Sequence, residues 1–152
     1  MTQSGEGGYT RVIFLFAGRA TAAHSTALSM TSEKLLARAI AVVETTQRRL
    51  PADLRKLARA VPVHYESGPD AELLAQGFEP DLLGLFVGDP YGTELSHDQS
   101  TPPQIILYVD CLWDYAEGDI GAFVEEVRIT YLHELGHYFG WEEDDLAARG
   151  LD

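Results

Sequence analysis

One stretch near the C-terminus decides how the rest of the chain is interpreted: Thr130-Tyr131-Leu132-His133-Glu134-Leu135-Gly136-His137-Tyr138-Phe139-Gly140-Trp141-Glu142-Glu143-Asp144-Asp145-Leu146. It contains the pattern His-Glu-x-x-His, followed by a glycine and an acidic run. On an α-helix of about 3.6 residues per turn, His133 and His137 share a face, so both imidazoles can reach one metal ion. Glu134 lies beside them and can take a proton from a metal-bound water, which is the arrangement that a zinc hydrolase needs.

The residues around this motif predict a helix from Asp119 to Phe139, with Asp119 as its N-cap. No proline interrupts it. Its apolar side chains recur at helical spacing: Ile120, Val124, Val127, Tyr131, Leu135 and Tyr138. His133 and His137 are expected to point away from the centre of this stripe, which argues against two histidines satisfied inside a core.

Length and composition indicate one globular domain over residues 31–152, preceded by an extension over residues 1–30. No apolar run approaches the length of a membrane span. The net charge of −13 argues against nucleic acid and anionic membrane surfaces as partners. The single cysteine, Cys111, excludes an intrachain disulfide, so we expect a cytoplasmic protein and treat Cys111 as a small buried hydrophobe. The oligomeric state stays open.

The N-terminal extension allows three interpretations. Arg11–Phe16 is a short apolar run that predicts a strand, and with the small residues after it also resembles a signal peptide. Alternatively, the native start is Met30, directly before a helix cap at Thr31-Ser32.

Between the extension and the motif, the pattern predicts alternating short elements. The expected helices cover residues 32–50, with Leu36, Ala39, Ile40 and Val43 on one face, then 52–60, and one or two turns in 70–76. The expected strands cover 61–65, at an edge or strand start because of Pro62, then 81–88, interrupted by Gly84, and 104–109. Residues 89–103 are expected to form a loop.

With these landmarks in place, the run from about Leu50 to Leu151 resembles the minimal zincins, a family of small zincin-like metallopeptidases. The matching residues are Leu50-Pro51, Leu82-Leu83-Gly84-Leu85-Phe86 with Gly88, Ile105-Ile106-Leu107-Tyr108, and the motif from His133 through Gly140 to Asp144-Asp145-Leu146. The resemblance implies a compact α+β domain, with a small mixed sheet packed on helices and an edge strand bordering the cleft over the zinc helix. It also implies one Zn²⁺ ion as cofactor.

The third zinc ligand is expected just after the helix. In the related pattern HExxHxxGxxH, the glycine turns the chain so that the last residue reaches the metal. Gly140 is that glycine here, and Glu143 occupies the ligand position. Asp144 is the rival, one residue later and with a shorter side chain. The predicted metal ligands are therefore His133, His137 and Glu143.

The predicted activity is hydrolysis of a peptide or protein substrate, with Glu134 as the catalytic general base. A peptide is expected to pair with the strand that ends near Val109. His97, Tyr91 and Tyr108 are candidate donors to the oxyanion, whereas His64 is interpreted as structural. Two alternatives remain: a zinc-binding fold without turnover, and a partner-binding module that keeps the site as a relic.

Overall fold

The structure is a computed structural model that describes residues 31–93 and 101–149. The expectations for the N-terminal thirty residues lie outside the described residues, as does His97 in the predicted loop.

A proline separates the first two helices, as the sequence predicts. Helix α1 spans Ser32–Arg49 and helix α2 spans Ala52–Ala60. Between them Leu50 is extended, with ψ of 150°, because the ring of the following Pro51 disfavours the helical region for the residue before it. The boundary at Pro51 is thereby confirmed.

Aspartate side chains begin two later helices. Asp70 Oδ1 accepts a hydrogen bond from Leu73 N at 2.9 Å and starts α3, Ala71–Ala75. Asp119 Oδ1 accepts from Ala122 N at 2.7 Å and starts α5, Ile120–Tyr138. These carboxylates satisfy amide groups that have no partner within the first helical turn. Both predicted helix starts are confirmed.

The sheet is small and mixed. Strands β1 (Val63–Glu66), β2 (Gly84–Val87) and β3 (Gln104–Tyr108) lie in the order β1-β3-β2. Strand β1 runs parallel to β3, with Val63 opposite Ile105, and β2 runs antiparallel to β3, with Gly84 opposite Leu107. Pro62 precedes an edge strand, as predicted, whereas residues 81–83 lie outside β2 and Gly84 begins that strand.

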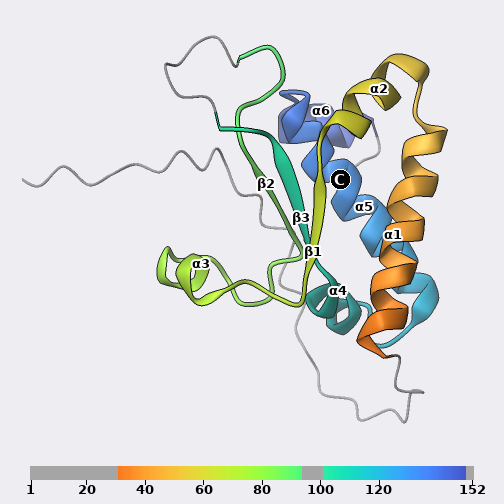
Figure 1. Ribbon diagram of the computed structural model, residues 1–152, viewed down its shortest axis with the longest axis vertical. Helices are drawn as coiled ribbons and strands as arrows, with labels where there is room; N and C mark the ends of the chain where they lie inside the picture. The colour runs from red at the N-terminus through yellow and green to blue at the C-terminus, as the bar shows by residue number, and fades with distance from the viewer. Residues whose placement is uncertain (1–30, 94–100, 150–152) are drawn as a thin grey trace, which may run out of the picture.

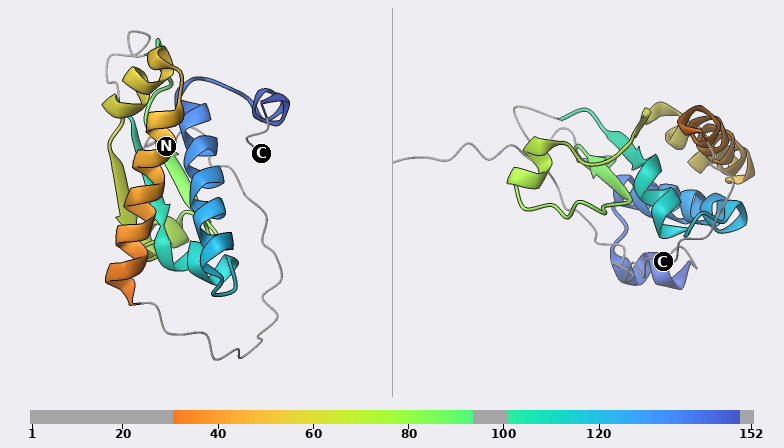
Figure 2. Two further views of the ribbon diagram at one scale, coloured as in Figure 1. Left: turned by 90° about the vertical axis from the view of Figure 1, so that its right-hand side faces the viewer. Right: turned by 90° about the horizontal axis from the view of Figure 1, so that it is seen from below.

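Helices α1 and α5 form a layer against one face of this sheet (Figures 1 and 2). Helix α5 packs against β2 and β3, and α1 packs beside α5. One hydrogen bond ties the two helices together, from Gln47 Nε2 to Tyr131 Oη at 2.9 Å. The α+β architecture expected from the family resemblance is confirmed.

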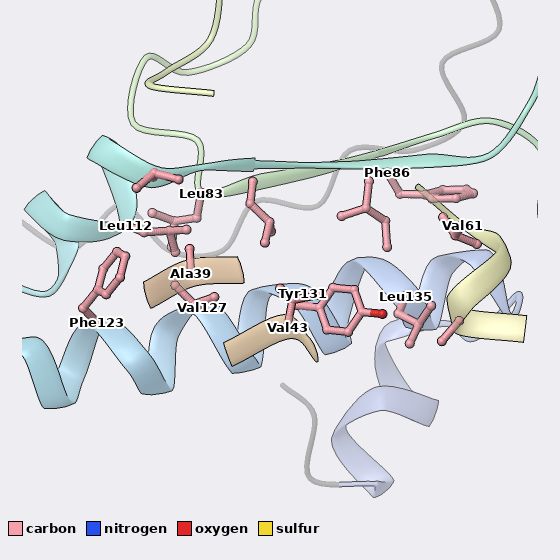
Figure 3. Packing of buried hydrophobic residues seen from close by; sticks show 14 of the residues in the cluster. Ala39, Val43, Val61, Leu83, Phe86, Leu112, Phe123, Val127, Tyr131 and Leu135 are labelled. Atoms are coloured by element: carbon pink, nitrogen blue, oxygen red, sulfur yellow. The ribbon is translucent and has the colours of Figure 1, made fainter. Parts of the chain in front are cut away.

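The main core fills the space between this helical layer and the sheet (Figure 3). It is built from side chains of α1, α5, β2 and β3, among them Ala39, Val43, Phe86, Leu107, Phe123, Val127, Tyr131 and Leu135. In both helices the buried residues recur at the predicted helical spacing, but some of the residues predicted to be buried are exposed. In α1, Leu35 is buried while Leu36 is 39% exposed, and in α5, Phe123 is buried while Ile120 is 38% exposed.

The other face of the sheet carries a second apolar cluster. Alternate side chains of a strand point to opposite faces. Accordingly Phe86 and Leu107 join the main core, whereas Leu85 and Tyr108 join Leu73, Leu82 and Val87 in the second cluster. Both faces of β2 are therefore apolar, which explains its uninterrupted hydrophobic sequence.

The sequence-based expectations missed two short helices. Helix α4 spans Val109–Tyr115 directly after β3, and α6 spans Glu143–Ala148 after the motif. Within residues 31–93 and 101–149, no helix has both the length and the hydrophobicity needed to cross a bilayer.

Candidate metal centre

His133 and His137 lie one turn apart on α5 with their rings facing a common space. The ring centroids are 5.0 Å apart and the ring planes are inclined by 71°. Two imidazoles at this spacing fit two positions of a tetrahedral zinc ion, whose bonds to histidine nitrogen are about 2.0–2.1 Å long. The structure thus brings together the two predicted histidine ligands.

Helix α5 is buried more completely than the sequence suggests. Every residue from Thr130 to Gly136 is buried, and this run covers nearly two helical turns, so all sides of the helix are enclosed. Although His133 is expected to point away from the centre of the apolar stripe, it is only 1% exposed, and His137 is half-buried, so this side of the helix is not open to solvent as expected. The apolar stripe of α5 is wider than predicted because its opposite side is also covered.

Glu134 is buried beside the histidines, with 1% of its side chain exposed. It lies against strand β2, since a Cβ atom built on Gly84 would be 3.3 Å from Glu134 Cγ. Burial of a carboxylate and an imidazole is costly unless each gains hydrogen bonds, an opposite charge or a metal. His133 and Glu134 therefore need specific polar interactions to be buried side by side on α5.

Gly140 turns the chain at the end of α5. Its φ of 77° lies in the left-handed region that glycine adopts without strain. Gly140 N donates to His137 O at 2.9 Å, and Trp141 N donates to Gly136 O at 2.9 Å. These two bonds form a Schellman motif, which closes a helix and redirects the chain. The predicted role of Gly140 as a turning point is confirmed.

The acidic run after this turn begins α6. Asp145 Oδ2 accepts a hydrogen bond from Glu142 N at 3.2 Å, as the third helical residue does in a capping box. Asp144 is exposed, and the side chain of Glu143 lies outside the described part of the structure. The capping role of Asp145 was missed, although a carboxylate three residues after the helix start is its usual signal.

The third ligand stays a prediction. Among the described residues, no group of three or more histidine, cysteine, aspartate or glutamate side chains is placed to hold a metal ion. In the left view of Figure 2, α6 lies to one side of α5, connected to it by residues 139–142. Glu143 is the first residue of that helix.

The loop after β2 is attached to the C-terminal end of α5. Tyr91 N donates to Tyr138 O at 2.7 Å, and the rings of these two residues lie edge to face with centroids 5.9 Å apart. The Tyr91 side chain is 53% exposed. Of the two candidate oxyanion donors that the structure describes, Tyr91 is the one that lies next to the C-terminal end of α5.

Tyr108 does not lie where an oxyanion donor is needed. Its ring packs in the second cluster, on the sheet face opposite to that of Leu107 and the main core. Burial raises the pKa of Tyr108 well above its usual range, and nearby acidic groups, Glu66 first among them and Glu134 last, raise it further. The phenol therefore stays protonated inside an apolar cluster.

Two other polar residues keep the structural interpretation given to them. His64 is exposed on β1, the edge strand on the far side of β3 from β2. Cys111 is less buried than expected, since it is only half-buried, and its Sγ lies 3.5 Å from Pro80 O. Burial raises the pKa of the Cys111 thiol, with Asp114 adding to the effect, and a protonated thiol is a poor metal ligand.

Comparison with known proteins adds one finding. A sequence model of the family described as zincin-like metallopeptidase matches residues 58–151, from the end of α2 through α6. No curated protein matches the chain.

Proposed function

Because the chain belongs to the zincin-like metallopeptidases, we propose that it hydrolyses peptide bonds with a zinc ion held by His133 and His137. The observation that carries this proposal is the buried face of α5, where the two imidazoles lie 5.0 Å apart and Glu134 is enclosed beside them. Family membership supports zinc binding and metallopeptidase-like chemistry in general terms. The roles of individual residues are the proposal.

Each residue has a distinct role in this mechanism. When bound, zinc lowers the pKa of a coordinated water to about 7 and polarises the scissile carbonyl. Glu134 accepts the proton of the attacking water and passes it to the leaving nitrogen. The enclosure of α5 excludes bulk water from the carboxylate, which strengthens its electrostatic interactions with the reacting groups. Tyr91 would donate a hydrogen bond to the oxyanion, and its ring contact with Tyr138, next to His137, supports this role.

Glu143 is proposed as the third ligand. The left-handed turn at Gly140 redirects the chain after His137, and α6 then begins with Glu143. Asp144 remains the rival carboxylate, whereas Asp145 is engaged as a helix cap. A ligand set of two histidines and one carboxylate leaves a fourth position for water.

The substrate is proposed to pair with β2 rather than with the strand ending near Val109. The expectation of pairing with that strand is wrong, because β3 is the central strand and is paired on both sides. In the described part of the chain, no strand pairs with the outer side of β2. Tyr108 N donates to Leu83 O at 3.0 Å, so the backbone groups of Leu83 face β3. Backbone groups alternate in direction along an antiparallel strand, and those of Gly84 and Phe86 therefore face the outer edge of β2. A peptide added there would pass beside Glu134.

The test is a peptide-library cleavage assay on zinc-loaded protein, with Glu134→Gln as the matched control. We expect cleavage by the parent and cleavage at least about a hundredfold slower by the variant, with zinc bound to both. A parent that retains less than about half an equivalent of zinc after gentle purification would exclude the metal site. A parent that binds zinc but cleaves no member of the library would favour a zinc-binding fold without turnover.

A further inference from the structure

Gly84, the first residue of β2, marks the closest approach of that strand to α5. A Cβ atom placed on Gly84 would lie 2.6 Å from Cγ2 of Thr130 and 3.3 Å from Cγ of Glu134. Thr130 and Glu134 are four residues apart, so they stack on one face of the helix. Gly84 therefore lies against the turn of α5 that carries the proposed general base.

The neighbours of Gly84 have little room to move. Carbon atoms in contact prefer separations of about 3.5–4.0 Å, so a distance of 2.6 Å cannot be accommodated without displacement. Thr130 is fully buried, and a β-branched side chain on a helix has few accessible rotamers. On the other side, the Gly84 Cβ would be 3.3 Å from the carbonyl oxygen of Ile106 in β3. An added methyl group would therefore separate β2 from α5 or displace Glu134.

Glycine is required here for space and not for backbone conformation. Gly84 does not have the positive φ angle that five other described glycines adopt. Gly88, four residues along the chain, differs in both respects, because its φ is 125° and its Cβ would lie 2.7 Å from the backbone Cα of Pro103. Of these two glycines, only Gly84 faces a side chain that can be trimmed to make room for a methyl group.

We propose that Gly84 is a positioning residue: its missing side chain sets the separation between the β2 backbone and the Glu134 carboxylate, and so holds the base beneath a substrate paired with β2. This inference rests on the proposed function of Glu134 and β2. His133 and His137 move with α5, whereas the substrate moves with β2. Widening the gap therefore impairs the proton transfer more than it impairs metal binding.

The test is a double-mutant cycle with Gly84→Ala, Thr130→Ser and the combined variant. Thr130→Ser removes the Cγ2 atom that would collide while it keeps the hydroxyl group. In metal-free protein, we expect Gly84→Ala to lower the urea midpoint and to shift the amide NMR signals of Thr130 and Glu134. The combined variant is expected to restore both, because the methyl group occupies the space that Cγ2 leaves.

The zinc-loaded proteins give a second readout. Gly84→Ala is expected to lower kcat roughly a hundredfold, as a misplacement of about 1 Å does, with the zinc dissociation constant close to that of the parent. Thr130→Ser is expected to recover most of this loss in the combined variant. Gly88→Ala serves as the matched control: it should destabilise the protein, and Thr130→Ser should not rescue it.

The two proposals fail in different ways. If the parent cleaves no peptide, the proposed hydrolysis fails, and the metal-free NMR cycle still decides whether Gly84 positions Glu134. Parent-like signals of Thr130 and Glu134 in Gly84→Ala overturn the inference. It is also overturned if Gly84→Ala keeps the parent kcat, or if Thr130→Ser rescues Gly84→Ala and Gly88→Ala equally.

Discussion

Helices α5 and α6, which carry the proposed zinc ligands, lie in very different environments. Helix α5 is enclosed over Thr130–Gly136, whereas the described side chains of α6, namely Asp144, Asp145, Ala147 and Ala148, are all exposed. Near α6, a cation–π contact places Arg149 4.0 Å from the ring of Trp141. The comparison teaches that the two histidines are held in place by the fold itself. We expect the proposed ligand on α6, by contrast, to gain much of its order from the metal.

Replacing His137 should have the largest effect, because it removes a ligand from the preorganised helix. The free energy of zinc binding is roughly 10–16 kcal/mol and is shared among three or four ligands. Each ligand therefore contributes about 3 kcal/mol or more, and its loss should lower the zinc affinity more than about a hundredfold. Zinc titration of His137→Ala against a competing chelator measures this loss. Full zinc affinity in the variant would show that the ligand assignment is wrong.

Glu134→Gln should separate catalysis from metal binding on the same helix. The amide has nearly the same shape but cannot accept the proton, so we expect kcat to fall about 10²–10⁴-fold. Zinc content and thermal stability should remain close to those of the parent. Steady-state kinetics on a cleaved library peptide provides the measurement, and a variant as active as the parent would rule out Glu134 as general base.

Glu143→Ala and Asp144→Ala form a matched pair on α6. Because α6 is exposed, its ligand must be ordered on binding, so we expect a smaller loss of zinc affinity than for His137→Ala, about 10–100-fold. Only the Glu143 variant should show it. The chelator competition used for His137 distinguishes the two, and the reverse result would assign the ligand to Asp144.

Removal of zinc should affect the two helices unequally. In chelator-treated protein, we expect the amides of α5 to keep their protection from hydrogen exchange, while those of α6 exchange faster than in the zinc-loaded form. The total change in hydrogen exchange should be small because α6 has only six residues. Equal loss of protection in both helices would contradict the view that the fold alone holds the histidines.

Local chemistry makes much of the fold predictable. Pro51 separates α1 from α2, Asp119 caps α5, and Gly140 ends it in a left-handed turn; each of these effects depends on a few neighbouring residues. The His-Glu-x-x-His spacing places its own residues on one helix without further information. For this reason His133, Glu134 and His137 are recognisable as candidate site residues from the amino-acid sequence alone.

Features that depend on distant residues are not predictable in this way. The burial of Leu35 in place of Leu36 in α1 depends on how that helix packs on α5. The order β1-β3-β2 depends on which strands meet, and the alternation of side chains along one strand does not encode its neighbours. The burial of His133 was missed because it depends on elements that cover the second side of α5.

Helix α1 belongs to the folded domain although it lies outside the segment that matches the family model. The family match begins at residue 58, inside α2, so α1 lies outside it. Nevertheless α1 packs Leu35, Ala39 and Val43 into the core shared with α5, and Gln47 donates to Tyr131. A fragment cut at the start of the match would present this apolar flank to water, and exposed patches of that kind promote aggregation. Expression of the domain for any of these experiments should therefore begin before Ser32.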